Sequence, residues 1–305
     1  MSENLSSPQT VIEIQALLAR HGTEPNRRLG QNFLIDGNLM RRLVDEAELD
    51  PARDVVLEVG TGTGSLTVML SDRAARVVTV ETDKKLIPVI EEVLAGRGNV
   101  RSVIADALAG KHVIAPEALS ALAAAVAEVG PRARFKLAAN LPYSIATPLV
   151  MNLMLSESRP SLLVFTAQKE VADRMAARAG TGEYGPVSLI CQGLATVETL
   201  HDLSPNVFWP KPQVFSTLVR IRPEPARIAA VGDLTLFHRV ALGLFAHRRK
   251  TCLKSLEMTI DLAEFRGRWA AMLAEVGIDP RVRGDTLPLA QVLALAKAVG
   301  EERQG

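Results

Sequence analysis

Residues 55–64, VVLEVGTGTG, decide the fold of this chain. The run 55–59 is apolar and β-branched, which predicts a buried strand, and it leads directly into three alternating glycines. Glycines at a strand-to-helix turn let the backbone approach a ligand closely. The dinucleotide fingerprint G-x-G-x-x-G does not fit, because its third glycine would stand at Ser65 or Thr67. The loop therefore predicts a ligand other than a dinucleotide, with a tight turn that binds nothing as the alternative.

Short runs of β-branched and apolar residues recur around this loop. The first five are separated by stretches compatible with helices, such as the alanine-rich segment 116–129. Strands that alternate with helices predict a mostly parallel sheet covered by helices on both faces, and hence an α/β fold. The predicted strands span residues 55–59, 76–81, 100–104, 134–139, 161–166, 194–200 and 216–222.

The pattern changes after residue 223. Residues 234–246, 262–276 and 289–299 have the spacing of apolar side chains that is typical of helices. Two prolines in Arg222–Pro225 block regular structure and predict a linker there. The predicted domains are a helical arm over residues 1–24 with Thr10 as helix cap, the sheet domain over 25–222 and a smaller, all-helical domain over 223–305.

The composition is that of an ordinary folded protein, with 305 residues of which 48% are hydrophobic and 23% charged. A net charge of +1 predicts no nucleic-acid partner, so such a partner must be argued from local patches. Cys191 and Cys252 lack the spacing of a metal site, and we expect no metal. No apolar run reaches the ~18 residues of a membrane span, and residues 1–20 resemble neither a secretory signal nor a transit peptide. We therefore expect a cytoplasmic protein without a membrane partner.

Two acidic residues follow the strands after the glycine loop. Glu81 ends the run 76–81, about 20 residues beyond the loop, where a carboxylate accepts hydrogen bonds from both hydroxyls of a ribose. Nicotinamide enzymes share this feature, so Glu81 alone does not choose the cofactor. Asp106 follows the third strand and could accept a hydrogen bond from the amine of a cofactor adenine, with a helix cap as the alternative.

The fourth strand ends in Asn140-Leu141-Pro142-Tyr143, at the edge where α/β folds bind ligands. The amino nitrogen N6 of adenine is a poor nucleophile, because its lone pair is delocalised into the ring. The Asn140 side-chain oxygen and the Leu141 carbonyl, whose direction Pro142 fixes, can accept hydrogen bonds from that amine and favour a pyramidal nitrogen. The Tyr143 ring offers a stacking surface for the base. The alternative is a strand end followed by a proline turn.

With these motifs the chain resembles the S-adenosylmethionine (SAM)-dependent rRNA adenine N6-dimethyltransferases of the small-subunit type, from about residue 27 to 290. The resemblance implies a Rossmann-like methyltransferase sheet with a smaller helical domain. The matching motifs are residues 28–34 (RLGQNFL), 57–60 (LEVG), 80–83 (VETD), 106–108 (DAL), 140–143 (NLPY), 168–171 (QKEV), 184–185 (YG), 208–212 (FWPKP) and 245–251 (FAHRRKT).

The resemblance implies roles for individual residues. Phe208 would stack on an extruded adenine opposite Tyr143, although a core role is its alternative. The implied contacts to SAM come from Asn32, Leu34, Gly60, Gly62, Glu81, Asp106 and Asn140. Two departures from the family pattern are Thr61, where a proline is usual, and Gln213, where a lysine is usual.

Arg248, Arg249 and Lys250 lie in a basic stretch, residues 239–254, that contains five basic residues and no acidic residue. Such a stretch is usually a solvated face, but the resemblance implies contact with RNA phosphates. The implied partner is small-subunit rRNA or a precursor of the small subunit, and we expect a monomer.

The expected function is SAM-dependent N6,N6-dimethylation of two adjacent adenosines near the 3′ end of small-subunit rRNA, in ribosome biogenesis. One alternative is a large-subunit rRNA methyltransferase of the antibiotic-resistance type. Another is a ribosome-assembly factor whose catalysis is incidental. A nicotinamide oxidoreductase is disfavoured by the missing third glycine.

Overall fold

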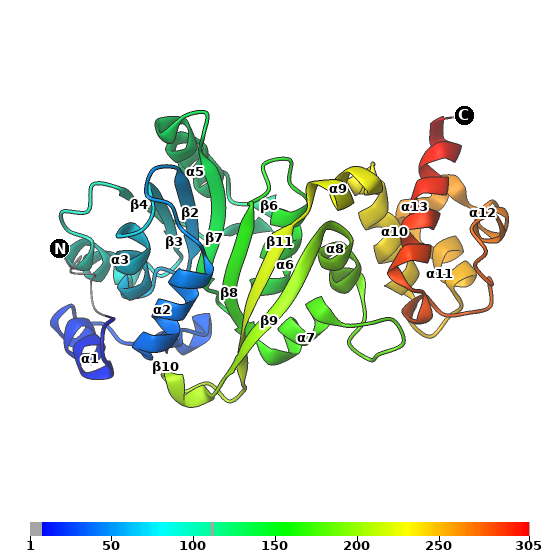
Figure 1. The fold of residues 1–305 in the computed structure, drawn as a ribbon. Helices are drawn as coiled ribbons and strands as arrows, with labels where there is room; N and C mark the ends of the chain where they lie inside the picture. The colour runs from blue at the N-terminus through cyan, green and yellow to red at the C-terminus, as the bar shows by residue number, and fades with distance from the viewer. Residues whose placement is uncertain (1–7, 111–112, 305) are drawn as a thin grey trace. The chain divides into compact units, whose positions relative to one another are not determined.

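The computed structural model describes residues 8–110 and 113–304 and divides into two compact units (Figure 1). The first unit consists of Met1–Lys169 and Thr199–Arg220, and the second of Glu170–Glu198 and Ile221–Gly305. The second unit thus includes residues 170–198, which the sequence analysis assigns to the sheet domain. The predicted domain boundaries stay a prediction.

A seven-stranded sheet in the order β4-β3-β2-β7-β8-β11-β9 forms the centre of the fold. All seven strands predicted from the sequence are present and make up this sheet, which confirms the predicted Rossmann-like α/β class. Their bounds are β2 Asp54–Val59, β3 Arg76–Glu81, β4 Val100–Ile104, β7 Arg134–Asn140, β8 Leu162–Gln168, β9 Ala195–Leu203 and β11 Ser216–Pro223.

Strand β2 is fully buried and pairs in parallel with β3 on one side and β7 on the other. Strand β7 in turn pairs in parallel with β8, with Asn140 opposite Thr166. Parallel strands end at the same edge of a sheet. The glycine loop after β2, Glu81 at the end of β3 and Asn140 at the end of β7 are therefore neighbours in space.

Helices and two small hairpin-like sheets complete the first unit. Met40 and Leu43 of α2 and Leu70 of α3 pack against one face of the main sheet, where they meet Val56 and Ala138. The two small sheets pair β1 with β10 and β5 with β6. The helical bounds are α1 Val11–Arg20, η1 Arg27–Leu29, α2 Gly37–Glu46, α3 Ser65–Ser71, η2 Lys84–Leu86, α4 Ile87–Val93, α5 Pro116–Val129, α6 Ala146–Leu155 and η3 Pro205–Val207, and the short strands are β1 Phe33–Leu34, β5 Leu108–Gly110, β6 Val113–Ile114 and β10 Phe208–Trp209.

The predicted N-terminal helix is confirmed as α1, and Thr10 caps it in a capping box with Glu13. Its apolar side chains Ile14, Leu17 and Leu18 are buried in a cluster within the first unit. The helix thus packs on the body of this unit. Residues 1–7 of the predicted arm lie outside the described residues.

Helices build most of the second unit. The predicted helix over 262–276 is wrong as a single element, because η4 ends before Gly267 adopts a positive φ of 79° and α12 starts beyond it. The bounds are α7 Lys169–Ala176, α8 Pro186–Leu194, α9 Pro225–Val231, α10 Leu234–Ala246, α11 Cys252–Met258, η4 Ile260–Phe265, α12 Trp269–Glu275, η5 Gly284–Thr286 and α13 Leu289–Gln304.

The predicted irregular linker at Arg222–Pro225 is also wrong. Strand β11 continues through Pro223, and α9 begins at Pro225. Proline is well suited to the first helical position, because the N–H that it lacks would have no partner there. Within residues 8–110 and 113–304 no single helix is long and apolar enough to span a membrane; α9 and α10 meet that measure only as a pair, which is bent by 75°.

A buried charge cluster holds the start of β2. Asp54 is 0% exposed and binds Arg134 Nε at 2.7 Å and Lys136 Nζ at 2.8 Å. Lys136 also donates to the carbonyl of Ala47 at 2.9 Å. Burial opposes the charge of Asp54, but the hydrogen bonds from Arg134 and Lys136 keep its pKa below the ordinary value.

We expect Asp54→Ala to lower the free energy of unfolding by about 3–5 kcal/mol, because it leaves Lys136 buried without its carboxylate. Urea unfolding measures the loss. The matched control is Glu92→Ala, which removes an exposed ion pair with Arg20 and should cost at most about 1 kcal/mol. Equal losses in the two variants would contradict a structural role for the buried cluster.

Candidate active site

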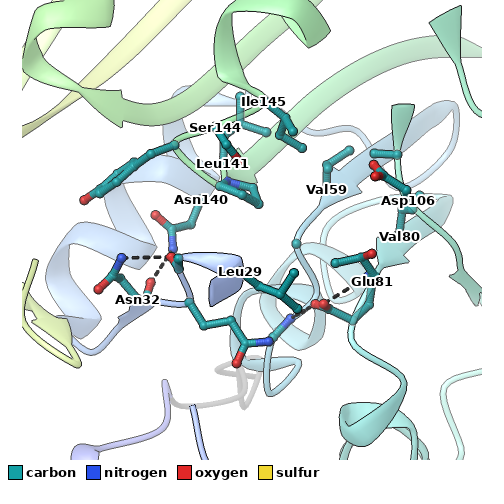
Figure 2. Close-up of a pocket in the computed structure, with 18 of the residues that line it drawn as sticks. Leu29, Asn32, Val59, Val80, Glu81, Asp106, Asn140, Leu141, Ser144 and Ile145 are labelled. Carbon is teal, nitrogen blue, oxygen red and sulfur yellow. Dashed lines mark hydrogen bonds between the residues drawn. The ribbon is translucent and has the colours of Figure 1, made fainter. Parts of the chain in front are cut away.

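A pocket lies at the edge of the sheet where β2, β3 and β7 end (Figure 2). Nine of the eleven residues predicted to act in catalysis or to contact the cofactor line it, and the exceptions are Leu34 and Phe208. The nine are Asn32, Gly60, Gly62, Glu81, Asp106, Asn140, Leu141, Pro142 and Tyr143.

Two positions of the glycine loop, Gly60 and Gly62, have little room for a side chain. Gly60 has a φ of 88°, and a Cβ atom on it would lie 3.2 Å from Cδ of Pro142. Gly62 has a φ of 57°, and its Cβ would lie 3.1 Å from the ring of Phe33. Both the backbone conformation and the close neighbours therefore require glycine. The backbone of Gly60 and Gly62 therefore lines the pocket directly and can be approached closely by a ligand.

A buried network of hydrogen bonds between Glu58 and three threonines connects this loop to β2, α3 and β3. Glu58 is 1% exposed and accepts hydrogen bonds from Thr67 Oγ1 at 2.6 Å and Thr79 Oγ1 at 2.7 Å. The hydroxyls of Thr79 and Thr61 are 2.6 Å apart. Thr61, one of the two departures from the family pattern, thus takes part in this network through its hydroxyl, which a proline at this position would lack. Burial raises the pKa of Glu58 to about 8.

Glu81 is held in a fixed orientation at the pocket. One carboxylate oxygen accepts the N–H of Gly62 at 2.9 Å, and the other accepts the N–H groups of Thr82 at 3.0 Å and Asp83 at 2.9 Å. Burial raises the pKa of Glu81, while these backbone bonds oppose the rise. A carboxylate has about four acceptor positions, so one ribose hydroxyl can bind without displacing a backbone bond. The remaining acceptor position fits one ribose hydroxyl, whereas the sequence predicts contacts to both hydroxyls.

Asp106 lines the same pocket on the side where Val80 and Glu81 lie, as Figure 2 shows. Its Oδ1 accepts the N–H of Leu108 at 3.0 Å, just before β5. Asp106 therefore caps a turn rather than a helix, and this bond leaves its second carboxylate oxygen as a further acceptor. An acceptor at this position fits an exocyclic amine.

Asn140 points toward Asn32 in the pocket (Figure 2). Its Nδ2 donates to the Asn32 carbonyl at 3.0 Å, and its Oδ1 accepts from Thr166 Oγ1 at 2.5 Å. Because a carbonyl can only accept, the first bond fixes which way the amide faces. Oδ1 keeps a second lone pair. Thr166 was not singled out from the sequence, since its role depends on the pairing of β7 with β8.

Tyr143 is held by its hydroxyl, which lies 2.7 Å from Oγ of the buried Ser216. Burial raises the pKa of the phenol, so it stays protonated. The Tyr143 side chain lines the pocket next to Asn140 and Pro142. A ring fixed in this way provides a rigid surface against which a base can stack.

Phe208 and Leu34 do not line the pocket but lie in the hydrophobic core. They are opposite each other in the β1–β10 pair, and both are buried, with 2% and 6% exposure, in the cluster beside α2 and α3. In this structure Phe208 therefore fills the core, which was the alternative to its expected role as a stacking ring. Both residues fix the backbone of the segment that carries Asn32.

The three expected RNA-binding residues lie in the second unit between α10 and α11. Arg248 donates to the carbonyls of Gly182 at 2.7 Å and Tyr184 at 2.9 Å, so part of its role is structural. Arg249 and Lys250 are exposed and have no ion pair within the part of the chain that the structure describes. Their charges are available to a ligand.

The seven-stranded sheet with its parallel strands β4, β3, β2, β7 and β8, the glycine loop and the acidic residue at the end of β3 define the class of Rossmann-like, SAM-dependent methyltransferases. The profile of the ribosomal RNA adenine dimethylase family matches residues 22–300. The chain belongs to this family, and SAM is its methyl donor.

Two relatives extend over nearly the whole chain. A ribosomal RNA small subunit methyltransferase A from Pelotomaculum thermopropionicum is 39% identical over 293 residues, covering 96% of each chain. One from Geobacillus thermodenitrificans is 36% identical over 301 residues, covering 98% of each chain.

Two solved structures have the same fold. A dimethyladenosine transferase from Plasmodium falciparum superposes with a TM-score of 0.68 at 20% identity, over 89% of this chain and 98% of the other. The 23S rRNA methyltransferase ErmE superposes with a TM-score of 0.59 at 25% identity, over 88% of this chain and 100% of the other.

The raised pKa of Glu58 predicts a pH-dependent stability. Between 4.5, the ordinary glutamate value, and about 8, the native state keeps a proton that the unfolded state releases. Stability that this group contributes at low pH is therefore lost as the pH rises through that range. We expect Glu58→Gln, which cannot ionise, to flatten the fall in unfolding free energy across this interval. Urea unfolding at a series of pH values measures the slope, and an unchanged slope would contradict the assignment.

Proposed function

We propose that this protein transfers methyl groups from SAM to N6 of two adjacent adenosines near the 3′ end of small-subunit rRNA, as a step in ribosome biogenesis. The observation that carries the proposal is the Asn140 amide, which is held from both sides at a pocket whose opposite end has the acceptors for SAM. The relatives named as small-subunit methyltransferases support the choice of RNA.

The amide and the peptide beside it act on the nitrogen of the substrate. SAM, when bound, supplies an electrophilic methyl group. Asn140 Oδ1, through its second lone pair, and the Leu141 carbonyl accept hydrogen bonds from the adenine amine. These bonds are strongest when the nitrogen is pyramidal and its lone pair is free to attack, so they stabilise the transition state more than the ground state. No strong base is required, because the proton is acidic once the methyl group has been added.

The remaining pocket residues position the two reactants. Glu81 would hold the cofactor ribose, Asp106 the adenine amine of the cofactor, and the backbone at Gly60 and Gly62 would lie along its amino-acid end. Tyr143 would stack on the target base, which must leave its helix at a cost of a few kcal/mol. Asn32 orients Asn140 through its carbonyl, while Leu34 and Phe208 would act from the core.

We further propose that Arg248, Arg249 and Lys250 contact RNA phosphates and that the protein acts as a cytoplasmic monomer. Exposed cations without an ion pair, such as Arg249 and Lys250, bind phosphates at little desolvation cost. The partner would be the small ribosomal subunit or its precursor.

The decisive experiment supplies labelled SAM to undermethylated small and large ribosomal subunits and maps the labelled nucleosides. We expect N6,N6-dimethyladenosine at two adjacent positions near the 3′ end of small-subunit rRNA. Label in large-subunit rRNA alone would favour the antibiotic-resistance type, which the 25% identity to ErmE keeps as the second candidate. Equal rescue of a deletion strain by the wild type and by Asn140→Ala would favour the assembly-factor role.

We expect Asn140→Ala to lower the single-turnover methylation rate by about 10²–10³-fold, the scale for one lost electrostatic contact in a transition state. SAM affinity, measured by calorimetry, should fall much less. Thr166→Val is the matched variant: it removes only the hydroxyl that orients the amide and should have a smaller effect on the rate. A near-normal rate for Asn140→Ala would refute the proposed role.

We expect Glu81→Ala to weaken SAM binding by roughly 10- to 100-fold, since hydrogen bonds to a charged group contribute about 1.5–3 kcal/mol each. Glu91→Ala is the control, because Glu91 is an exposed acidic residue of α4 that does not line the pocket. Calorimetry on the two variants gives the comparison. If both retain the wild-type affinity, Glu81 does not hold the cofactor.

A further inference from the structure

A second hollow of the first unit adjoins the active-site pocket. It is lined by Glu24, Arg27, Arg28, Lys85 and Trp209, together with neighbouring backbone. Arg28 lines both this groove and the pocket that contains Asn140. The two hollows therefore adjoin at Arg28, so a polymer with one residue in the pocket would have its next residues beside the groove.

Specific contacts bring the basic side chains together from distant parts of the sequence. Gln31 Nε2 donates to Asp83 Oδ2 at 2.9 Å, and Gln31 Oε1 accepts the N–H of Asn26 at 2.7 Å. Asp83 also accepts the N–H of Lys85 at 3.1 Å. The turn that carries Arg27 and the turn that carries Lys85 are thus fixed side by side through Gln31.

Trp209 closes the groove on another side. It is opposite Phe33 in the β1–β10 pair, and the two rings stack with centroids 6.2 Å apart and planes inclined by 26°. The indole remains partly exposed where it lines the groove. An aromatic surface beside cations is the arrangement by which proteins bind single-stranded nucleic acid, since bases stack while cations hold the phosphates.

The charge of the groove is not neutralised by the protein. Arg27, Arg28 and Lys85 are exposed, and none has an ion pair among residues 8–110 and 113–304. In contrast, Arg20 pairs with Glu92 close by in the same unit. Glu24 is the acidic residue of the lining, which leaves an excess of positive charge in a chain whose net charge is only +1.

We propose that this groove binds the phosphodiester backbone of the RNA strand on one side of the target adenosine, with Arg27 and Lys85 on phosphates and Trp209 against a flanking base. Arg28 is placed to contact the phosphate nearest the extruded nucleotide. This inference rests on the proposed function, because it uses the pocket as the position of the target base.

The test measures how the affinity for RNA depends on salt. A labelled RNA fragment with the target sequence is titrated at several salt concentrations with the wild type, with Arg27→Gln and Lys85→Gln singly and combined, and with Arg132→Gln. Loss of two phosphate contacts should make the slope of log K against log salt shallower by about 1.4, and each single variant should account for about half of that. Arg132, an exposed arginine before β7 at the opposite edge of the sheet, is the matched control and should leave the slope unchanged.

SAM affinity, measured by calorimetry, reports whether the variants keep the fold of the pocket and should equal that of the wild type. A wild-type slope for the double variant and both single variants would overturn the inference. A second result would also overturn it: the wild type binds inorganic phosphate tightly, and the double variant loses this binding but keeps the wild-type affinity for RNA. The groove would then be a site for a free anion. Failure of the wild type to methylate RNA would instead refute the proposed function.

Discussion

The close approach of the glycine loop to the end of β7 is the constraint on which the site depends. Parallel pairing of β2 with β7 brings Gly60 against the ring of Pro142, so that a Cβ atom on Gly60 would lie only 3.2 Å from Cδ of that ring. This contact places the glycine loop next to Asn140 and Leu141, the residues proposed to bind the substrate amine. A methyl transfer needs its two reacting atoms within van der Waals contact, and a parallel sheet provides that proximity because its strands end at one edge.

The amide of Asn140, to which we assign the catalytic role, is oriented by groups that come from three separate segments. Asn32 lies before the sheet, Asn140 ends β7 and Thr166 lies on β8, and each hydrogen bond between them requires the other strands to be in register. An amide that was free to rotate would present its NH₂ group to the substrate for part of the time. The fixed orientation therefore keeps Oδ1 directed at the position proposed for the substrate nitrogen, so no reorientation of the amide is needed during the reaction.

Much of the fold follows from local patterns, and the failures have physical reasons. All seven strands of the main sheet were predictable because each is a short run of apolar and β-branched residues between turn residues, and the parallel strands β2, β7 and β8 are buried along most of their length. The helix over 262–276 was wrong because the spacing of apolar residues outweighed Gly267, whose positive φ ends regular structure. The linker at Arg222–Pro225 was wrong because proline at a first helical position begins a helix rather than preventing one. The β1–β10 pair was not predicted, since two-residue strands leave no periodic signal.

By itself the sequence determined the class of the fold, the cofactor loop and the identity of the chemical groups at the site, because these depend on residue types at short spacings. Only the tertiary structure decided that Thr166 and Ser216 hold Asn140 and Tyr143, that Phe208 is buried in the core, and that Arg27 and Lys85 share one groove. Each of these depends on contacts between residues far apart in the chain. Such contacts arise from strand order and register, which no local pattern of residues encodes.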